Sequence, residues 1–142
     1  MPEIHHQLTI KGTASKVFEA VSTPHGLNSW WTLDCKGVPK ILAEFDLIFP
    51  EPFHWQAIVS KFVKNKLIEF TATKADEDWT GQKFGFELTE KDGQTTLRFY
   101  QKTWKENSDH YRVSSYCWAI YLRLLKRYVE NGEVAEYQFR ND

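Results

Sequence analysis

The chain has 142 residues, 42% of them hydrophobic and 26% charged, which is the ordinary composition of one folded domain and excludes long disordered or fibrous segments. Eighteen Lys and Arg residues against nineteen Asp and Glu residues give a formal net charge of -1, so no overall field favours nucleic acid or an anionic membrane surface. No segment reaches the ~18 consecutive apolar residues of a membrane span, and the first residues lack the apolar core of a signal peptide. We therefore expect a single cytoplasmic domain over residues 1–142.

The N-terminal part of the chain predicts one strand followed by two short helices. Apolar residues recur near every second position from Ile4 to Ile10, which is the period of a half-buried strand. The hydroxyl and small residues at 13–15 can cap a helix that Pro24 then stops. A second short helical turn is expected from His25 to Trp31.

The middle of the chain predicts a meander of about five or six antiparallel strands, because the apolar period changes to two and persists as far as residue 104. Alternating stretches lie around residues 45–49, 55–59, 68–72, 84–88 and 97–101. Pro50 and Pro52 predict a tight turn between the first two of these stretches. Asp92 and Gly93 form a strong signal for a two-residue hairpin turn between the last two.

The last third of the chain predicts one long amphipathic helix. Asn107 and Ser108 can cap its start, and Asn131-Gly132 is a typical C-terminal stop. The apolar face carries Trp118, Tyr121, Leu125 and Tyr128, opposite a charged face of Arg123, Lys126, Arg127 and Glu130. The element order predicts an α+β protein in which a curved antiparallel sheet wraps around this helix.

Two strings in the chain resemble a known family. They are GTASKVFEAVSTPHGLNSWWT, at 12–32, and YCWAIYLRLLKRYVENG, at 116–132. Together with the element order they resemble the SRPBCC superfamily (START-like, Bet v 1-like). Within it, the chain is most similar to the family of homologues of the heat-shock-protein-90 ATPase activator, in its C-terminal-domain-like branch. The resemblance implies a helix-grip fold with a cavity rather than a particular reaction, and it implies binding of lipids or other hydrophobic molecules.

No catalytic or metal-binding pattern stands out. The five histidines show neither H-x-x-x-H nor H-E-x-x-H spacing, and His5 and His6 should point to opposite faces of one strand. Cys35 and Cys117 are too far apart for a C-x-x-C motif, and there is no G-x-S-x-G elbow or glycine-rich phosphate loop. We therefore expect no metal, no cofactor and no catalytic residue.

The abundance of rings suggests a ligand chamber between helix and sheet, although the same rings could fill a solid core. At least one of Trp30 and Trp31 should be buried, either as a plug or as a pocket wall. Gln101 and Ser114 fall in phase with buried neighbours and could orient a ligand. The expected ligand-binding residues are Trp30, Trp31, Phe45, Trp55, Phe70, Phe84, Phe86, Phe99, Gln101, Ser114, Trp118 and Tyr121.

The leading hypothesis is a non-catalytic protein that holds a hydrophobic or aromatic, lipid-like small molecule, and it requires a cavity of at least ~300 Å³. The alternative is a protein-interaction module, chaperone-associated, stress-related or self-associating. In that alternative, exposed aromatic residues dock a partner protein or a second copy of the chain. Its candidate residues are Trp79, in a polar loop, together with Trp104 and Phe139.

Overall fold

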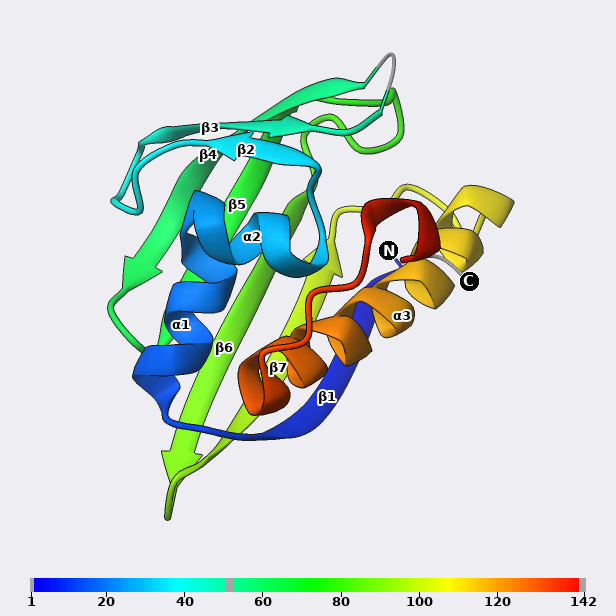
Figure 1. Cartoon of the computed structure of the whole chain (residues 1–142). Helices are drawn as coiled ribbons and strands as arrows, with labels where there is room; N and C mark the ends of the chain where they lie inside the picture. Colours follow the sequence, from blue (N-terminus) through cyan, green and yellow to red (C-terminus); the bar gives the residue numbers. More distant parts are fainter. Residues whose placement is uncertain (1, 51–52, 141–142) are drawn as a thin grey trace.

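The computed structural model describes residues 2–50 and 53–140. A seven-stranded antiparallel sheet forms one layer, and all three α-helices lie against its concave face (Figure 1). The elements in chain order are β1 (Ile4–Lys11), α1 (Ala14–Ser22), α2 (Pro24–Trp30), β2 (Asp34–Lys36), β3 (Glu44–Ile48), β4 (His54–Val63), β5 (Leu67–Lys74), β6 (Lys83–Lys91), β7 (Gln94–Lys102), α3 (Asp109–Asn131) and a short 3₁₀ turn, Tyr137–Phe139. The predicted α+β helix-grip fold is confirmed.

The sheet places the first strand of the chain beside the last. Its strand order is β1-β7-β6-β5-β4-β3-β2, with Ile4 opposite Gln101 and Lys11 opposite Gln94. Helices α1 and α2 carry the chain from the β1 edge to the β2 edge, and a meander of hairpins then returns it (Figure 1). The hairpin between β6 and β7 turns at Asp92 and Gly93, whose positive φ angles of 53° and 75° suit the predicted two-residue turn.

A tight corner between α1 and α2 delivers the tryptophan pair to the interior. The hydroxyl of Thr23 accepts from the backbone N–H of Gly26 and caps α2, while Pro24 occupies its first turn. Gly26 has no room for a side chain, because a Cβ there would lie 2.5 Å from the carbonyl oxygen of Glu19. The indole N–H of Trp30 donates to the carbonyl of Ala20 at 2.9 Å, which locks the two helices together.

Helix α3 begins and ends where the sequence predicts. Ser108 caps it by accepting from the backbone N–H of Tyr111, and Gly132 terminates it in the left-handed conformation with φ of 71°. The residues buried along α3 are Ser114, Trp118, Leu122, Leu125 and Val129. The predicted charged face is only partly solvated, because Lys126 donates to the carbonyl of Thr9 and Glu130 accepts from the backbone N–H of Lys11. Both residues therefore fasten α3 to β1.

The alternating stretches in the middle of the chain correspond to β3–β7, and their predicted inward residues lie on the core side of the sheet. The short edge strand β2 pairs with β3. The expected proline turn involves Pro52, which lies outside the described residues. Among the residues described, no helix is both long and apolar enough to cross a membrane.

Candidate functional site

A pocket of about 260 Å³ opens at the end of the sheet where the β3–β4 connection and the β5–β6 loop (75–82) face the N-terminal half of α3. Several of its lining residues are solvent-exposed, so the pocket is a bowl rather than a closed chamber. Its volume lies below the ~300 Å³ that the ligand hypothesis requires. The lining residues are Trp31, Phe49, Phe53, Trp55, Asp76, Trp79, His110, Val113, Ser114, Cys117, Trp118 and Tyr121.

Five of the lining rings form a closed circle, which we call the aromatic belt. The belt consists of Trp31, Phe49, Trp55, Trp79 and Trp118. Taken in that order and back to the start, the ring centroids lie 5.5, 5.3, 4.9, 6.0 and 5.0 Å apart. The belt joins the residues directly after α2 and β3 with β4, the β5–β6 loop and α3, so residues distant in sequence build one wall.

Phe84 closes the inner side of the belt. Its ring packs against Trp31, Trp79 and Trp118, with centroid distances of 5.6, 5.9 and 5.9 Å. Phe84 is fully buried and does not line the pocket, so it separates the bowl from the rings deeper in the core.

The structure divides the expected ligand-binding residues into two groups. Those that line the pocket are Trp31, Trp55, Ser114, Trp118 and Tyr121. Those that lie in the core behind it are Trp30, Phe45, Phe70, Phe84, Phe86, Phe99 and Gln101. For the second group the solid-core alternative describes the packing, because the rings fill the space between sheet and helices.

Sequence reasoning missed the remaining lining residues. Val113 and Cys117 stand eight and four residues before Tyr121 on α3, so helical spacing could have identified them. Phe49 continues the alternation of Phe45 and Leu47 by one step and could also have been found. Asp76 and Trp79 lie in a loop, where no periodic signal exists. Phe53 stands two residues before Trp55, and His110 stands four residues before Ser114 on α3, so the strand and helix periods could have identified both.

Two aromatic residues expected to be exposed are buried, and the docking hypothesis is wrong for both. Trp79 is only 6% exposed, because the β5–β6 loop folds back through backbone hydrogen bonds from Trp79 to Asp76 and from Gln82 to Trp79. Trp104 is 2% exposed and meets His110 and Tyr111 edge-on, with ring centroids 5.5 Å away in both cases. Phe139 is 58% exposed, as expected.

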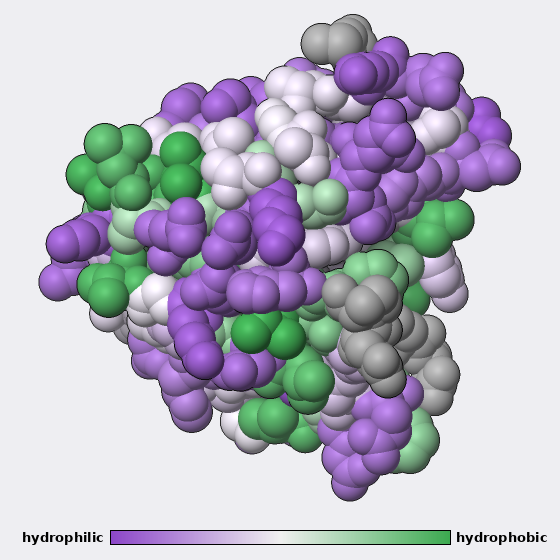
Figure 2. Space-filling view, turned by 90° about the horizontal axis from the view of Figure 1, so that it is seen from above, coloured by the Kyte–Doolittle hydropathy of each residue, from purple (hydrophilic) through white to green (hydrophobic). Residues whose placement is uncertain are grey.

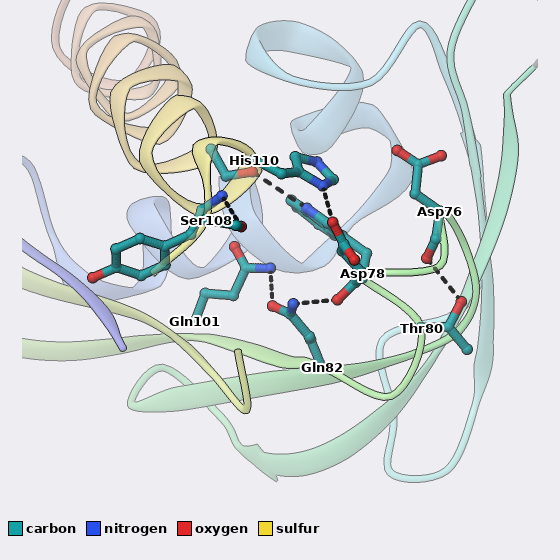
Figure 3. A network of polar contacts seen from close by, with 10 residues as sticks. Asp76, Asp78, Thr80, Gln82, Gln101, Ser108 and His110 are labelled. Carbon is teal, nitrogen blue, oxygen red and sulfur yellow. Dashed lines mark hydrogen bonds and ion pairs between the residues drawn. The ribbon is translucent and has the colours of Figure 1, made fainter. Parts of the chain in front are cut away.

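A chain of polar contacts runs behind the pocket from the core to the surface (Figure 3). The indole N–H of Trp118 donates to the side-chain oxygen of Gln101 at 2.8 Å, and the Gln101 amide donates to Gln82. Gln82 in turn donates to the main-chain oxygen of Asp78, whose carboxylate lies 2.9 Å from Nδ1 of His110. Gln101 therefore supports the belt from behind and contributes no group to the pocket.

The pocket lining contains few ionisable side chains, and His110, its basic one, is paired with Asp78. Asp76 contributes its only carboxylate, and no Lys or Arg of the described residues lines it. Burial raises the pKa of the Cys117 thiol, so this sulfur is held in its neutral form. The hydroxyl of Ser114 accepts from the indole N–H of Trp79 at 3.4 Å. Within the described part of the chain, no group of three His, Cys, Asp or Glu side chains could hold a metal ion.

Comparison with known proteins identifies the same relationship that the two sequence strings suggest. The model of the family described as Activator of Hsp90 ATPase homolog 1-like protein matches residues 11–130. No curated protein matches the chain in sequence.

Solved structures extend the similarity to the whole fold. The solution structure of the Aha1 dimer from Colwellia psychrerythraea is 29% identical, with a TM-score of 0.85, and the match covers 94% of this chain and 99% of that one. A Staphylococcus saprophyticus protein is 18% identical, with a TM-score of 0.80 and coverage of 95% and 96%. A Bacillus halodurans protein is 21% identical, with a TM-score of 0.76 and coverage of 92% and 98%.

Proposed function

The chain belongs to the family of Activator of Hsp90 ATPase homolog 1-like proteins, and on that premise we propose that it is a binding protein for a small aromatic molecule. The observation that carries the proposal is the aromatic belt, a closed circle of rings around an open bowl. A flat apolar ligand would bury its surface against these rings, and each well-placed pair of aromatic rings adds about 0.5–1.5 kcal/mol beyond burial.

The size of the bowl limits the ligand. An engineered cavity of ~150 Å³ is enough to hold benzene, so a pocket of about 260 Å³ suits a molecule of one or two fused rings. A long acyl chain would need the space that Phe84 fills. Because the pocket is smaller than the ~300 Å³ required for the lipid-like ligand expected from the sequence, we limit the proposal to a small, flat aromatic molecule.

The test is a titration with 2-naphthol, followed through the indole N–H signals in a proton–nitrogen NMR spectrum. We expect the signals of the belt tryptophans to shift in a saturable way. Replacing Cys117→Phe puts a ring into the bowl and should weaken binding by about tenfold or more. The matched control is Ala119→Phe, which adds the same ring at an exposed position of α3. Absence of saturable shifts, or equal affinity in the two variants, would contradict the proposal.

A second candidate function is self-association, which the dimeric Colwellia relative favours. Residues 133–140, which we call the C-terminal strap, return from α3 toward α2. There the guanidinium of Arg140 donates to the carbonyls of Asn28 and Thr32 at 2.8 and 3.2 Å. The neighbours of these anchored residues are apolar and open to solvent, with Leu33 49% and Phe139 58% exposed. We propose that a second copy of the chain covers them.

The view from above in Figure 2 shows several separate apolar groups divided by hydrophilic side chains, not one continuous apolar face. A mixed surface of this kind suits a modest dimer interface. In sedimentation velocity at protein concentrations from about 1 to about 100 μM, we expect the sedimentation coefficient of the wild type to rise from the monomer value toward the dimer value. The double variant Leu33→Ser and Phe139→Ser should stay monomeric, whereas Leu42→Ser, at another exposed site, should not differ from wild type. A wild-type monomer at every concentration would rule out this candidate.

A further inference from the structure

Resting on the proposed function, we propose that the molecule held by the aromatic belt carries a positive charge, in the manner of an organic ammonium ion, and that Asp76 supplies the opposite charge. The ionisable side chains around the bowl are mostly acidic. Asp76 is followed directly by Glu77 and Asp78, so this loop carries three consecutive acidic residues, of which Asp76 lines the pocket. Of the described residues that line the pocket, none is a lysine or arginine, and the one basic side chain, His110, is already paired with Asp78.

The Asp76 carboxylate is free to take a partner. Asp76 uses its main-chain oxygen to accept from the backbone N–H groups of Trp79 and Thr80, which fixes the loop. Its carboxylate forms no hydrogen bond or ion pair within the described part of the chain. By contrast, the carboxylate of Asp78 is paired with His110. In Figure 3 the Asp76 carboxylate points away from Thr80, out of the loop. A carboxylate that is exposed and unpaired can accept a cationic group without first breaking another contact.

The rings of the aromatic belt themselves attract positive charge. Aromatic rings are negative over their faces, so they attract a cation within ~6 Å of the ring centre, and tryptophan does so best. Four of the five belt rings are tryptophans. Neighbouring belt rings are tilted against each other by 20° to 66°. Trp55 and Phe49 are the partly exposed rings of the belt, whereas Trp31, Trp79 and Trp118 reach the pocket with only a small part of their surface. Rings in varied orientations with one carboxylate at the mouth are the chemistry that binds a trimethylammonium group.

A neutral aromatic ligand would satisfy the belt but not use Asp76. A preference for a cationic ligand is distinguished from a preference for a neutral one by two probes of the same shape, (4-hydroxyphenyl)trimethylammonium and 4-tert-butylphenol. Both are titrated into the full chain at low ionic strength, with the indole N–H signals as the readout. We expect the cation to bind about tenfold more tightly than its neutral counterpart. Added salt should weaken only the cation, because screening acts on charged pairs.

The variant Asp76→Asn removes the charge and keeps the shape of the side chain. It should reduce the affinity for the cation by about fivefold and leave the affinity for 4-tert-butylphenol unchanged. Glu77→Gln, which removes a neighbouring charge outside the lining, is the matched control and should have a smaller effect.

The outcomes separate this inference from the function on which it rests. Equal binding of both probes overturns the preference for a cation while the proposed binding function stands. Binding of neither probe, together with no response to 2-naphthol, overturns the binding function and this inference with it. A cation preference that persists unchanged in Asp76→Asn overturns the role of Asp76.

Discussion

On the outer face of the sheet, three residues on neighbouring strands depend on one another. Glu69 of β5, Gly85 of β6 and Tyr100 of β7 lie side by side across the sheet. The Tyr100 hydroxyl donates to the carboxylate of Glu69 at 2.6 Å, and Glu69 is only 2% exposed. Burial, together with this carboxylate, raises the pKa of Tyr100 above its usual value. Gly85 lets the phenol ring lie flat over β6.

Replacing Gly85→Ala should destabilise the protein by about 2–3 kcal/mol, because the new Cβ would lie 2.5 Å from Cζ and the hydroxyl oxygen of Tyr100. The displaced ring would take the Tyr100 hydroxyl away from the buried Glu69 carboxylate, which would keep only the Ser60 hydroxyl as a close donor. Urea unfolding of the variant measures the loss. The check is a double-mutant cycle, since in a Tyr100→Ala background the same glycine substitution should cost little. Additive costs would show that the two residues are not coupled.

Cys35 makes stability fall at alkaline pH. Burial raises the pKa of its thiol to about 12, whereas the thiol in an unfolded chain has a pKa of about 8.5. Between about pH 8.5 and pH 12 the thiol has lost its proton in the unfolded chain but keeps it in the folded chain. The free energy of unfolding therefore falls by about 1.4 kcal/mol per pH unit from this group. Urea unfolding between pH 8 and 10.5 should therefore show a shallower decline in Cys35→Ala than in wild type. Parallel declines would contradict the assignment.

The sequence does not predict whether a single side chain in a loop is buried or exposed. The run of charged residues before Trp79 predicts a solvated side chain, yet the ring is buried in the belt. What decides its position is the fold of the loop and the space between β4 and α3, which no local pattern records. Trp104 fails for the same reason, since its burial depends on the first turn of α3 packing against it.

At the scale of the elements, period and capping residues predict almost everything. The inward residues of β3–β7, the caps of α1 and α3 and the Asp92-Gly93 turn follow from alternation and local hydrogen bonding, and the structure confirms them. Strand β2 has only three residues, with Cys35 its single buried side chain, so it shows no period to detect. Its pairing with β3 is set by the chain arriving from α2.

The corner between α1 and α2 predicts a specific sensitivity. Gly26→Ala should lower stability by about 2 kcal/mol or more, although alanine favours helices, because the Cβ would collide with backbone atoms of Glu19 and Ala20. Thermal and urea unfolding measure the effect. His25→Ala, at the exposed neighbouring position, is the control and should be close to neutral. A neutral Gly26→Ala would mean that the two helices separate freely.

At the scale of the whole molecule, the position of a ring between the sheet and the helices decides whether it lines the pocket or fills the core. Alternation correctly places both Trp55 and Phe84 on the inner side of the sheet. It does not say which ring stands at the mouth and which closes the floor, because that depends on how far each strand runs along the helix. The sequence therefore predicts a ring-rich interior, and only the packed structure shows that most of those rings fill it.

Phe84→Ala should join the bowl to the core. The loss of a buried phenylalanine ring should cost about 3–5 kcal/mol in urea unfolding. In the same variant the longer ligand 4-phenylphenol should gain affinity relative to 2-naphthol, measured by the indole N–H signals. Phe84→Leu opens less space and should show the same changes to a smaller degree. It replaces the alanine variant in the binding test if that variant does not fold. An unchanged ratio of affinities would show that Phe84 is not the floor.

The pairing of β1 with β7 also governs how the chain is made. During translation β1 leaves the ribosome first, and the strand that satisfies its backbone hydrogen bonds follows only after residues 94–101 have been added. Until then its amide and carbonyl groups stand open at an edge, where another chain can pair with them. The newly synthesised protein is therefore most exposed to wrong pairing just before its final hairpin emerges, and closure of the sheet is a late event of its synthesis.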